Sequence, residues 1–387
     1  MNIFNRIADW LETRACTPAY AGWLLGAIAV CFIAAAVNTM VGWLYALGGI
    51  TFALLGIAAV LPVRSLRNLT VRRHSILPVT AGDKLTVEIE IENSTNQPKT
   101  LLQIQDVLPY VLGKPVQTAI ENIPPHSTHN WVYEQPTERR GIYRWHAVQV
   151  RTAAPVGLFW CRRSREVPAT AIVYPTVLPL SHCPIVDEIG REDSAQFSSR
   201  DRQSQAATVG LTKALRPYRI GDPTRLIHWR TSARYGELKV RELEVFTSGQ
   251  EIIICLDSAA IWPTEDFEQA VIAAASMYFY ACRQQLNVKL WTASTGLLQG
   301  NRVVLETLAA TRAGEEGSAG ATPNLPLIWL TQNPGSLNSV PTGSRWMLWP
   351  QALPDESAKL VNQYSSGLVI KTEQPLQLQL QSRGSGI

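Results

Sequence analysis

The longest apolar stretch of the chain predicts two membrane-spanning helices. No Asp, Glu, Lys or Arg occurs between Arg14 and Arg64. One span needs about 20 residues, so a single helix over this stretch would be far too long and a hairpin fits better. We expect spans at about 20–37 and 41–61, with the turn at Asn38-Thr39. A cleaved signal peptide is the competing interpretation, but a second apolar run follows the first directly.

Basic residues flank this predicted hairpin on both sides and predict its orientation. Arg6 and Arg14 precede it, Arg64 and Arg67 follow it, and the turn carries no basic residue. By the positive-inside rule both ends lie in the cytoplasm. We therefore expect residues 1–67 to form an N-terminal segment with an anchor in the lipid bilayer. The protein would be a multi-pass protein of the inner (plasma) membrane, with its large domains cytoplasmic.

After the anchor, apolar and polar residues alternate with a period of two. The residues Leu85, Val87, Ile89 and Ile91 alternate with polar neighbours, which predicts a strand with one buried face. Shorter strand-like pieces recur at 100–107, 129–134, 141–151 and 169–174, separated by loops rich in Pro. This spacing predicts an immunoglobulin-like β-sandwich over residues 68–176, without the Cys…Trp…Cys core of antibody domains. The polar residues 177–210 would be a linker.

The pattern changes again after Gly249, to alternating strands and helices. Residues 251–256 form a continuous apolar run, typical of a strand buried on both faces. We expect further strands at 288–291, 327–330, 346–349 and 368–370, with helices at 266–285, 302–311 and 357–363. Such alternation predicts a mostly parallel, Rossmann-type sheet in a domain spanning 211–387. In residues 376–380 Leu alternates with Gln, which we interpret as an edge strand or a loose tail.

Composition narrows the classes of function. Charged residues make up 17% of the chain and its formal net charge is +4, too weak a bias to indicate nucleic acid as a partner. The six cysteines are scattered and none forms a Cys-x-x-Cys pair. This spacing argues against a zinc site or a disulfide framework and favours reduced thiols in a cytosolic setting.

The charges are concentrated in residues 211–244, which we call the signature block. Arginine favours planar partners such as carboxylate or phosphate, so the block is a candidate docking surface or a lattice of internal ion pairs. We expect a mixed role: Ile220, Ile227 and Trp229 pack, Gly221 and Gly236 form turns, and some arginines face a partner. The candidate partner-binding residues are Arg216, Arg219, Asp222, Arg225, His228, Trp229, Arg230, Arg234, Arg241 and Glu242.

One part of the block resembles a known family. The segment RPYRIGDPTRLIHWRTSARYGELKVRE (216–242) is similar to the signature of the domain of unknown function 58 family. Upstream, the pieces DVLP (106–109), RGIY (140–143) and PVGLF (155–159) resemble that family too, although Ala154 stands where the family more often has Asp. The resemblance implies a von Willebrand factor A-like domain. It also implies that a MoxR-type AAA+ ATPase and an unknown client protein are partners in chaperone-like assembly or maturation.

The resemblance raises the question of a metal site. In the von Willebrand factor A fold, an Asp-x-Ser-x-Ser motif at the end of the first strand supplies oxygen ligands to magnesium. This chain has Asp257-Ser-Ala-Ala-Ile261, so only the carboxylate of Asp257 is kept. We expect Asp257 to cap the following loop or to pair with an arginine of the signature block. Magnesium at Asp257 is the alternative; otherwise no cofactor is expected.

These observations predict a membrane-anchored adaptor that docks partner proteins and has no catalytic residues. His228 is the only imidazole near the block, no Ser or Cys has an evident base beside it, and no Gly-rich phosphate loop occurs. Two alternatives stay open. One is a metal- or phosphate-dependent enzyme of envelope metabolism, which would use Asp257 and the arginines. The other is a module that binds anionic lipid headgroups.

Overall fold

The structure is a computed structural model. It describes residues 12, 16–189, 211–219, 224, 227–244, 251–317, 323, 325–350, 367–371 and 373–382. The chain divides into two compact units, Met1–Tyr174 and Pro175–Ile387. We describe each unit by itself.

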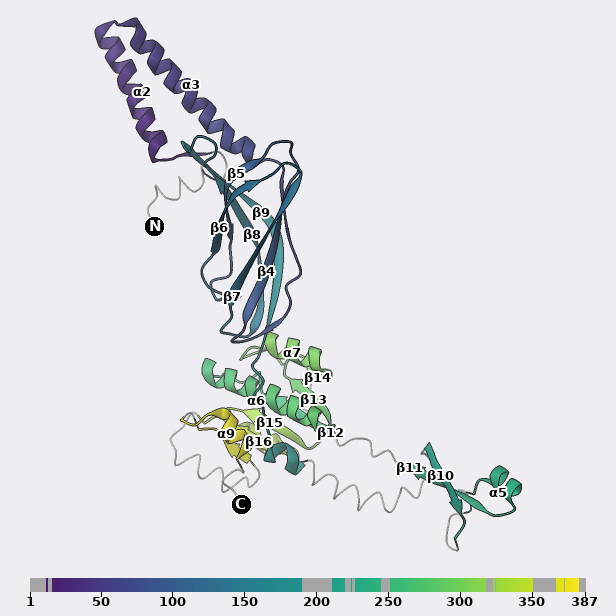
Figure 1. Cartoon of the computed structure of the whole chain (residues 1–387). Helices are drawn as coiled ribbons and strands as arrows, with labels where there is room; N and C mark the ends of the chain where they lie inside the picture. Colours follow the sequence, from purple (N-terminus) through teal and green to yellow (C-terminus); the bar gives the residue numbers. More distant parts are fainter. Residues whose placement is uncertain are drawn as a thin grey trace. The chain divides into compact units, whose positions relative to one another are not determined.

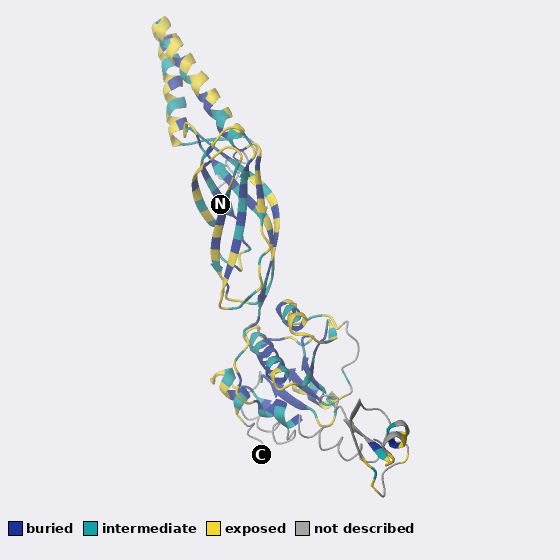
Figure 2. Ribbon diagram, turned by 45° about the vertical axis from the view of Figure 1, so that its right-hand side comes forward, coloured by how far each residue is buried: buried dark blue, intermediate teal, exposed yellow. Residues whose placement is uncertain are grey.

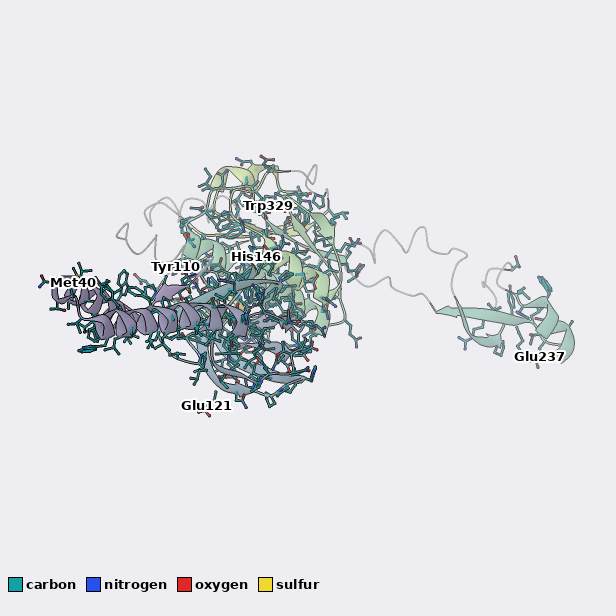
Figure 3. All side chains as sticks on the ribbon, turned by 90° about the horizontal axis from the view of Figure 1, so that it is seen from above. Met40, Tyr110, Glu121, His146, Glu237 and Trp329 are labelled. Carbon is teal, nitrogen blue, oxygen red and sulfur yellow. The ribbon has the colours of Figure 1, made fainter. Side chains whose placement is uncertain are left out.

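The first unit contains the two predicted apolar helices, α2 (Tyr20–Thr39) and α3 (Gly42–Ser65). Both are long and apolar enough to cross a membrane, and they run side by side (Figure 1). The chain reverses at Met40, which has a left-handed backbone (φ 56) and lies at the tip of the hairpin (Figure 3). The predicted turn at Asn38-Thr39 is therefore wrong by two residues, because both still belong to α2.

A β-sandwich follows the hairpin in the same unit. Its larger sheet has the strand order β1-β9-β8-β5-β6, with β3 also paired to β9, and its smaller sheet has the order β2-β4-β7. The strands are β1 (Thr17–Pro18), β2 (Leu69–Arg73), β3 (Val79–Thr80), β4 (Lys84–Asn93), β5 (Lys99–Asp106), β6 (Val116–Ile123), β7 (Ser127–Pro136), β8 (Gly141–Thr152) and β9 (Phe159–Tyr174).

The two sheets enclose one hydrophobic core. Leu85 and Ile89 of β4 are fully buried and share a cluster with Ile104 of β5 and Val150 of β8. Buried and exposed positions alternate along the strands (Figure 2), as the period of two predicts. The sequence prediction missed β1, β2, β3 and β6 and the first half of β9, because their apolar positions are too few or too irregular to form a pattern.

The predicted linker at 177–210 is wrong in its first part. Leu180, Cys183, Val186 and Ile189 are buried in the core of the second unit, and residues 184–189 are helical. The amide of Leu178 also donates to Ser276 Oγ (2.9 Å). The whole stretch was predicted to be a linker because it is rich in charged residues and serine from residue 187 onward. Residues 190–210 lie outside the described part of the chain.

The second unit is built on a mostly parallel sheet with the order β14-β13-β12-β15-β16-β17, in which β14 alone is antiparallel to its neighbour. In the sheet's own numbering this order is 3-2-1-4-5-6, the strand order of Rossmann-type sheets. The strands are β12 (Glu251–Leu256), β13 (Asn287–Thr292), β14 (Gly296–Leu298), β15 (Leu327–Thr331), β16 (Arg345–Leu348) and β17 (Gly367–Val369).

Apolar side chains cover both faces of this sheet, as the continuous apolar runs predict. On one face Ile252 and Ile254 pack with α6 (Thr264–Arg283) and α7 (Asn301–Ala310). On the other face Ile253 and Cys255 pack with the tryptophans of neighbouring strands. The predicted helices at 266–285 and 302–311 are therefore confirmed, whereas the predicted helix at 357–363 lies outside the described residues.

The predicted edge strand or loose tail at 376–380 is a helix, α9 (Leu376–Gln381). Gln379 explains the difference. Its carboxamide accepts from Lys371 N (2.7 Å) and donates to the carbonyls of Lys371 and Gln374 (2.8 Å each). Leu380 is fully buried while Leu378 is exposed. The alternation of Leu and Gln therefore does not indicate a strand. It arises because Leu380 is buried in the core and the Gln379 amide is fully hydrogen-bonded.

Candidate functional site

The signature block folds into a small hairpin–helix module (residues 211–244). Strand β10 (Leu211–Pro217) pairs with the antiparallel strand β11 (Lys239–Glu244), and α5 (Trp229–Tyr235) lies between them in sequence. Ile227 forms a β-bridge with Val240, and both side chains are buried. The prediction that Ile227 packs is confirmed.

Hydrogen bonds fix the backbone around α5. His228 Nδ1 accepts from the amide of Thr231 (3.2 Å), so this imidazole caps the helix. Ser232 Oγ donates to the carbonyl of His228 (3.0 Å) and accepts from the amide of Lys239 (2.8 Å). Gly236 ends the helix with φ 69, which confirms the predicted turn there. The role that the structure gives His228 is therefore to hold the helix in place.

Trp229 departs from the prediction that it packs, because 64% of its surface is exposed. It is the first residue of α5, directly after His228, whose imidazole caps this helix. Among the module's side chains whose burial the structure describes, Ile227, Ser232 and Val240 are buried and Trp229 is not. Leu238 is 43% exposed as well, so the module presents apolar surface to solvent.

The module brings most of the predicted partner-binding residues together. In the strand register, Arg216 lies opposite Val240 and Arg241 opposite Leu215. Arg219, just beyond β10, is exposed, and the module is the segment marked by Glu237 in Figure 3. The remaining candidates with described backbone are Arg230 and Arg234 in α5 and Glu242 in β11. Asp222 and Arg225, together with Ile220 and Gly221, lie outside the described residues.

Asp257 lies elsewhere, at the carboxyl end of β12 in the parallel sheet. Its Oδ2 accepts from Thr331 Oγ1 (2.7 Å), at the end of the adjacent strand β15. A backbone hydrogen bond from Ala260 also reaches this carboxylate. These contacts match the expected loop cap. The strand order of the sheet reverses between β12 and β15, and in α/β sheets such a switch point is the usual place for a ligand.

The polar groups around Asp257 mostly bond to one another. Ser258 Oγ accepts from the amide of Ala293 (3.0 Å), and its carbonyl accepts from the amide of Gly314 (2.8 Å). The carboxylate of Glu315 accepts from Ser294 Oγ (2.7 Å). Among the residues that the structure describes, no three His, Cys, Asp or Glu side chains gather as metal ligands.

The sequence interpretation missed the partners of Asp257. Thr331 and Ser258 are fully buried polar residues at strand ends, and Gln332 is buried beside them with both carboxamide atoms unpaired among the described residues. Thr331 lies 74 positions from Asp257, so only the parallel pairing of β12 with β15 brings them together. The sequence offered one signal for this contact, which is that a polar residue directly follows each of the two apolar runs, Asp257 after 251–256 and Thr331 after 327–330.

We predict that Asp257→Asn leaves the protein as stable as the wild type at pH 7, or more stable. Burial raises the pKa of Asp257, against the opposing effect of the Thr331 hydrogen bond. The unfolded carboxyl therefore ionises at lower pH than the folded one, and stability falls as pH rises from about 4 through the folded pKa. Asparagine keeps an acceptor for Thr331 and removes that loss.

Thermal melting of the full chain at pH 4 and pH 7 measures this effect. The difference between variant and wild type should vanish near pH 4. Thr331→Val, which removes the hydrogen bond but keeps the charge, should instead lower stability at both pH values. A variant Asp257→Asn that is less stable than wild type at pH 7, and only when Mg²⁺ is added, would show that the carboxylate binds a cation.

Taken together, the described residues define a protein with two apolar, membrane-type helices, a β-sandwich and a parallel α/β unit preceded by an arginine-rich module. Residues 214–299, from this module to β14, match the model of the family described as "Protein of unknown function DUF58". The chain is also 27% identical over 227 residues to the "Uncharacterized protein YeaD" of Bacillus subtilis (strain 168). The two matches support the assignment of this chain to the DUF58 family.

That alignment covers 57% of this chain and 54% of the relative, so the chain spans about half the length of the curated protein that it matches. Among solved structures, the chain is similar to the CARDB domain of the PF1109 protein from Pyrococcus furiosus. The identity is 12%, the match covers 27% of this chain and 93% of that one, and the TM-score is 0.19. A β-glucosidase from Listeria innocua matches at 18% identity over 26% of this chain and 16% of its own, with a TM-score of 0.15. At TM-scores of this size neither likeness defines a fold for the chain.

Proposed function

We propose that this protein is a membrane-anchored adaptor that docks a partner protein on its hairpin–helix module. The proposal rests on the exposure of Trp229. This residue belongs to an arginine-rich segment whose backbone is fixed by hydrogen bonds. Trp and Arg are the residues that most often dominate the energy of protein–protein contacts. An exposed indole at the start of a capped helix loses little conformational freedom when a partner covers it.

The anchor in this proposal is the helical hairpin. Its apolar side chains are exposed along both helices, as in Trp23, Val30, Ile50, Ile57 and Val60. Exposed apolar surface over 20 and 24 residues is unfavourable in water and favourable in hydrocarbon. We propose that the hairpin spans the inner (plasma) membrane. The basic residues on both flanks, such as Arg14 and Arg64, support cytoplasmic large domains.

The partner that we propose is a MoxR-type AAA+ ATPase, acting with this protein in the assembly or maturation of a client protein. The family resemblance suggests this partner. The charges of the module suit an acidic docking surface, because ionic complementarity supplies specificity and rapid encounter. Arginine forms bidentate contacts with carboxylates that lysine cannot replace.

We also propose finer assignments for the two folded units. The order β14-β13-β12-β15-β16-β17 with an antiparallel edge strand supports a von Willebrand factor A-like domain in which the magnesium site is degenerate. In the sandwich, Tyr143 donates its hydroxyl to the carbonyl of Arg139 (2.7 Å). This contact resembles the tyrosine corner of immunoglobulin-like domains and supports that architecture.

We predict that Trp229→Ala weakens binding of the ATPase about 30-fold, the effect of removing an aromatic anchor worth about 2 kcal/mol. The measurement is the dissociation constant of the purified MoxR-type ATPase for the full chain in detergent micelles. Tyr110→Ala is the matched control, since Tyr110 is an aromatic residue of the sandwich that is 96% exposed. This control should bind as wild type does.

Other outcomes would contradict the proposal. If Trp229→Ala and wild type bind the ATPase equally, or neither binds, the module is not the docking face for this partner. If liposomes with anionic lipid bind the module and Trp229→Ala abolishes that binding, the lipid-binding alternative is favoured. If Mg²⁺ protects the second unit against melting and Asp257→Asn removes the protection, the metal-dependent enzyme is favoured.

A further inference from the structure

Two cysteines of the first unit come together at the pairing of β1 with β9: Cys16 directly precedes β1, and Cys161 lies on β9. In the short antiparallel pairing of β1 with β9, Thr17 lies opposite Trp160 and Pro18 opposite Phe159. Extending this register by one residue places Cys16 opposite Cys161. Residues directly opposite in an antiparallel pair project to the same face of the sheet. Both cysteines pack against the hydrophobic core of the sandwich, which agrees with this register.

The hydrogen-bond pattern shows which kind of pair this is. Pro18 has no amide hydrogen, so the pair Pro18–Phe159 cannot exchange two backbone hydrogen bonds. The next pair in the register, Ala19–Leu158, is hydrogen-bonded, because the amide of Ala19 donates to the carbonyl of Leu158 (2.8 Å). Pro18–Phe159 is therefore a non-hydrogen-bonded pair. Pairs alternate along an antiparallel ladder, so Cys16–Cys161, two residues further on, is also non-hydrogen-bonded.

Such a pair has the spacing that a disulfide needs. Opposite Cα atoms in non-hydrogen-bonded pairs are about 4.5 Å apart, and disulfides join Cα atoms about 4.4–6.8 Å apart. The structure has both thiols reduced. Burial raises the pKa of both thiols, and the nearby Arg163 guanidinium opposes that effect in part.

The segment that carries Cys16 is held against the sandwich at a second place. Glu12 Oε1 accepts from Arg151 Nε of β8 (2.5 Å), and the guanidinium of Arg151 stacks on the ring of Trp160 (4.2 Å to the centroid). Glu12 is itself nearly buried. Contacts on both sides of Cys16 thus keep its thiol facing β9.

We propose that Cys16 and Cys161 form a reversible disulfide that locks the segment before α2 to strand β9 when the protein meets a peroxide. The Cys16 thiolate, the more exposed of the two, attacks one oxygen of hydrogen peroxide, forms a sulfenic acid and releases water after protonation. The Cys161 thiolate attacks that sulfur and expels the oxygen as a second water. Two thiols and one peroxide give one disulfide and two waters, and a dithiol reverses the reaction by exchange.

Other cysteines serve as internal controls. Cys255 lies opposite Trp291 and Trp329 in its sheet, so it has no thiol across from it. Cys31 lies on α2, inside the proposed membrane span, so detergent should shield its thiol from a water-soluble oxidant. A site-selective response should therefore involve residues 16 and 161 and spare residue 255.

The test uses the full chain in detergent micelles, treated with hydrogen peroxide, blocked with N-ethylmaleimide and digested for mass spectrometry. We expect one linked peptide pair that joins Cys16 to Cys161, lost on treatment with dithiothreitol and absent from Cys16→Ser. The oxidised wild type should melt about 5 °C higher than the reduced form, because the bond closes a long loop of the unfolded chain. Cys31→Ser should behave as wild type in both measurements.

Three results would overturn the inference. In one, Cys16 and Cys161 stay reduced while Cys31 is oxidised. In another, the linked peptides join two different chains, which would make the bond intermolecular. In the third, the melting shift persists in Cys16→Ser, so that oxidation stabilises the protein without this pair.

Discussion

Arg73→Ala should lower the free energy of unfolding of the first unit by about 3–5 kcal/mol, the range for removing one partner of a buried ion pair. Arg73 Nη2 donates to Asp106 Oδ1 (2.7 Å), and the two side chains are 1% and 0% exposed. Arg73 Nη1 donates to the carbonyl of Val167 (2.5 Å). The substitution leaves a carboxylate in the sandwich core without its cation.

The other partners of Asp106 cannot compensate for that loss. Tyr133 donates its hydroxyl to Oδ2 (2.7 Å) and Trp145 donates Nε1–H to Oδ1 (3.0 Å). Burial, with the nearby Asp106 charge, raises the pKa of Tyr133, so the phenol stays a donor. Neutral donors stabilise a carboxylate less than a guanidinium does. Tyr133→Phe, which removes one such bond, should cost only about 1–3 kcal/mol.

The neighbouring residue supplies the matched control. Arg72 is one position away on β2, but its side chain is 67% exposed and 3.7 Å from Glu92. Arg72→Ala should change stability by less than about 0.5 kcal/mol. Urea unfolding of the full chain, followed by tryptophan fluorescence, measures all three variants. Equal effects of Arg72→Ala and Arg73→Ala would mean that the buried pair is not what holds the two sheets together here.

Gly367→Ala should destabilise the second unit by about 3 kcal/mol through overpacking. Gly367 lies opposite Trp346 in the pairing of β16 with β17. A Cβ at residue 367 would overlap the indole ring of Trp346, which is only 5% exposed. The ring would have to leave its place among the buried side chains on that face of the sheet, or β17 would have to separate from β16.

Two further variants decide whether this overlap is the cause. Gly317→Ala meets no atom within 4 Å, so its melting temperature should stay that of wild type. Trp346→Leu, combined with Gly367→Ala, gives the new methyl group room and should recover part of the stability lost in the single glycine variant. If the double variant is the sum of the two single losses, the contact between residues 346 and 367 does not explain the effect.

Much of the architecture was predictable because it depends on local periodicity. The apolar run between Arg14 and Arg64 predicts the helical hairpin, and the run 251–256 predicts β12 with its bounds. The C-terminal helix α9 was not predictable in this way. Its stability comes from the Gln379 amide and from burial of Leu380, which are tertiary contacts that local alternation does not reveal.

The candidate site, too, was predictable only where its features follow from residue type or local pattern. The composition of the signature block predicts an arginine-rich module, and the turn at Gly236 and the packing of Ile227 follow from residue type. The exposure of Trp229 could not be predicted from the sequence, because a tryptophan side chain is on average largely buried. The contact of Asp257 with Thr331 depends on which strands pair, so no local pattern predicts it.

The helical hairpin and the sandwich join at both ends of the hairpin. The residue before α2 bonds to the sandwich through Ala19 N and the carbonyl of Leu158 (2.8 Å), and the residue after α3 accepts at the Leu66 carbonyl from Arg165 (2.9 Å). Gly22 lets α2 approach Leu158 where any Cβ would collide. With two attachment points, the sandwich cannot swivel about a single tether. If the hairpin spans a membrane as proposed, a change in bilayer thickness that alters the tilt of the hairpin would therefore tilt the sandwich by the same angle.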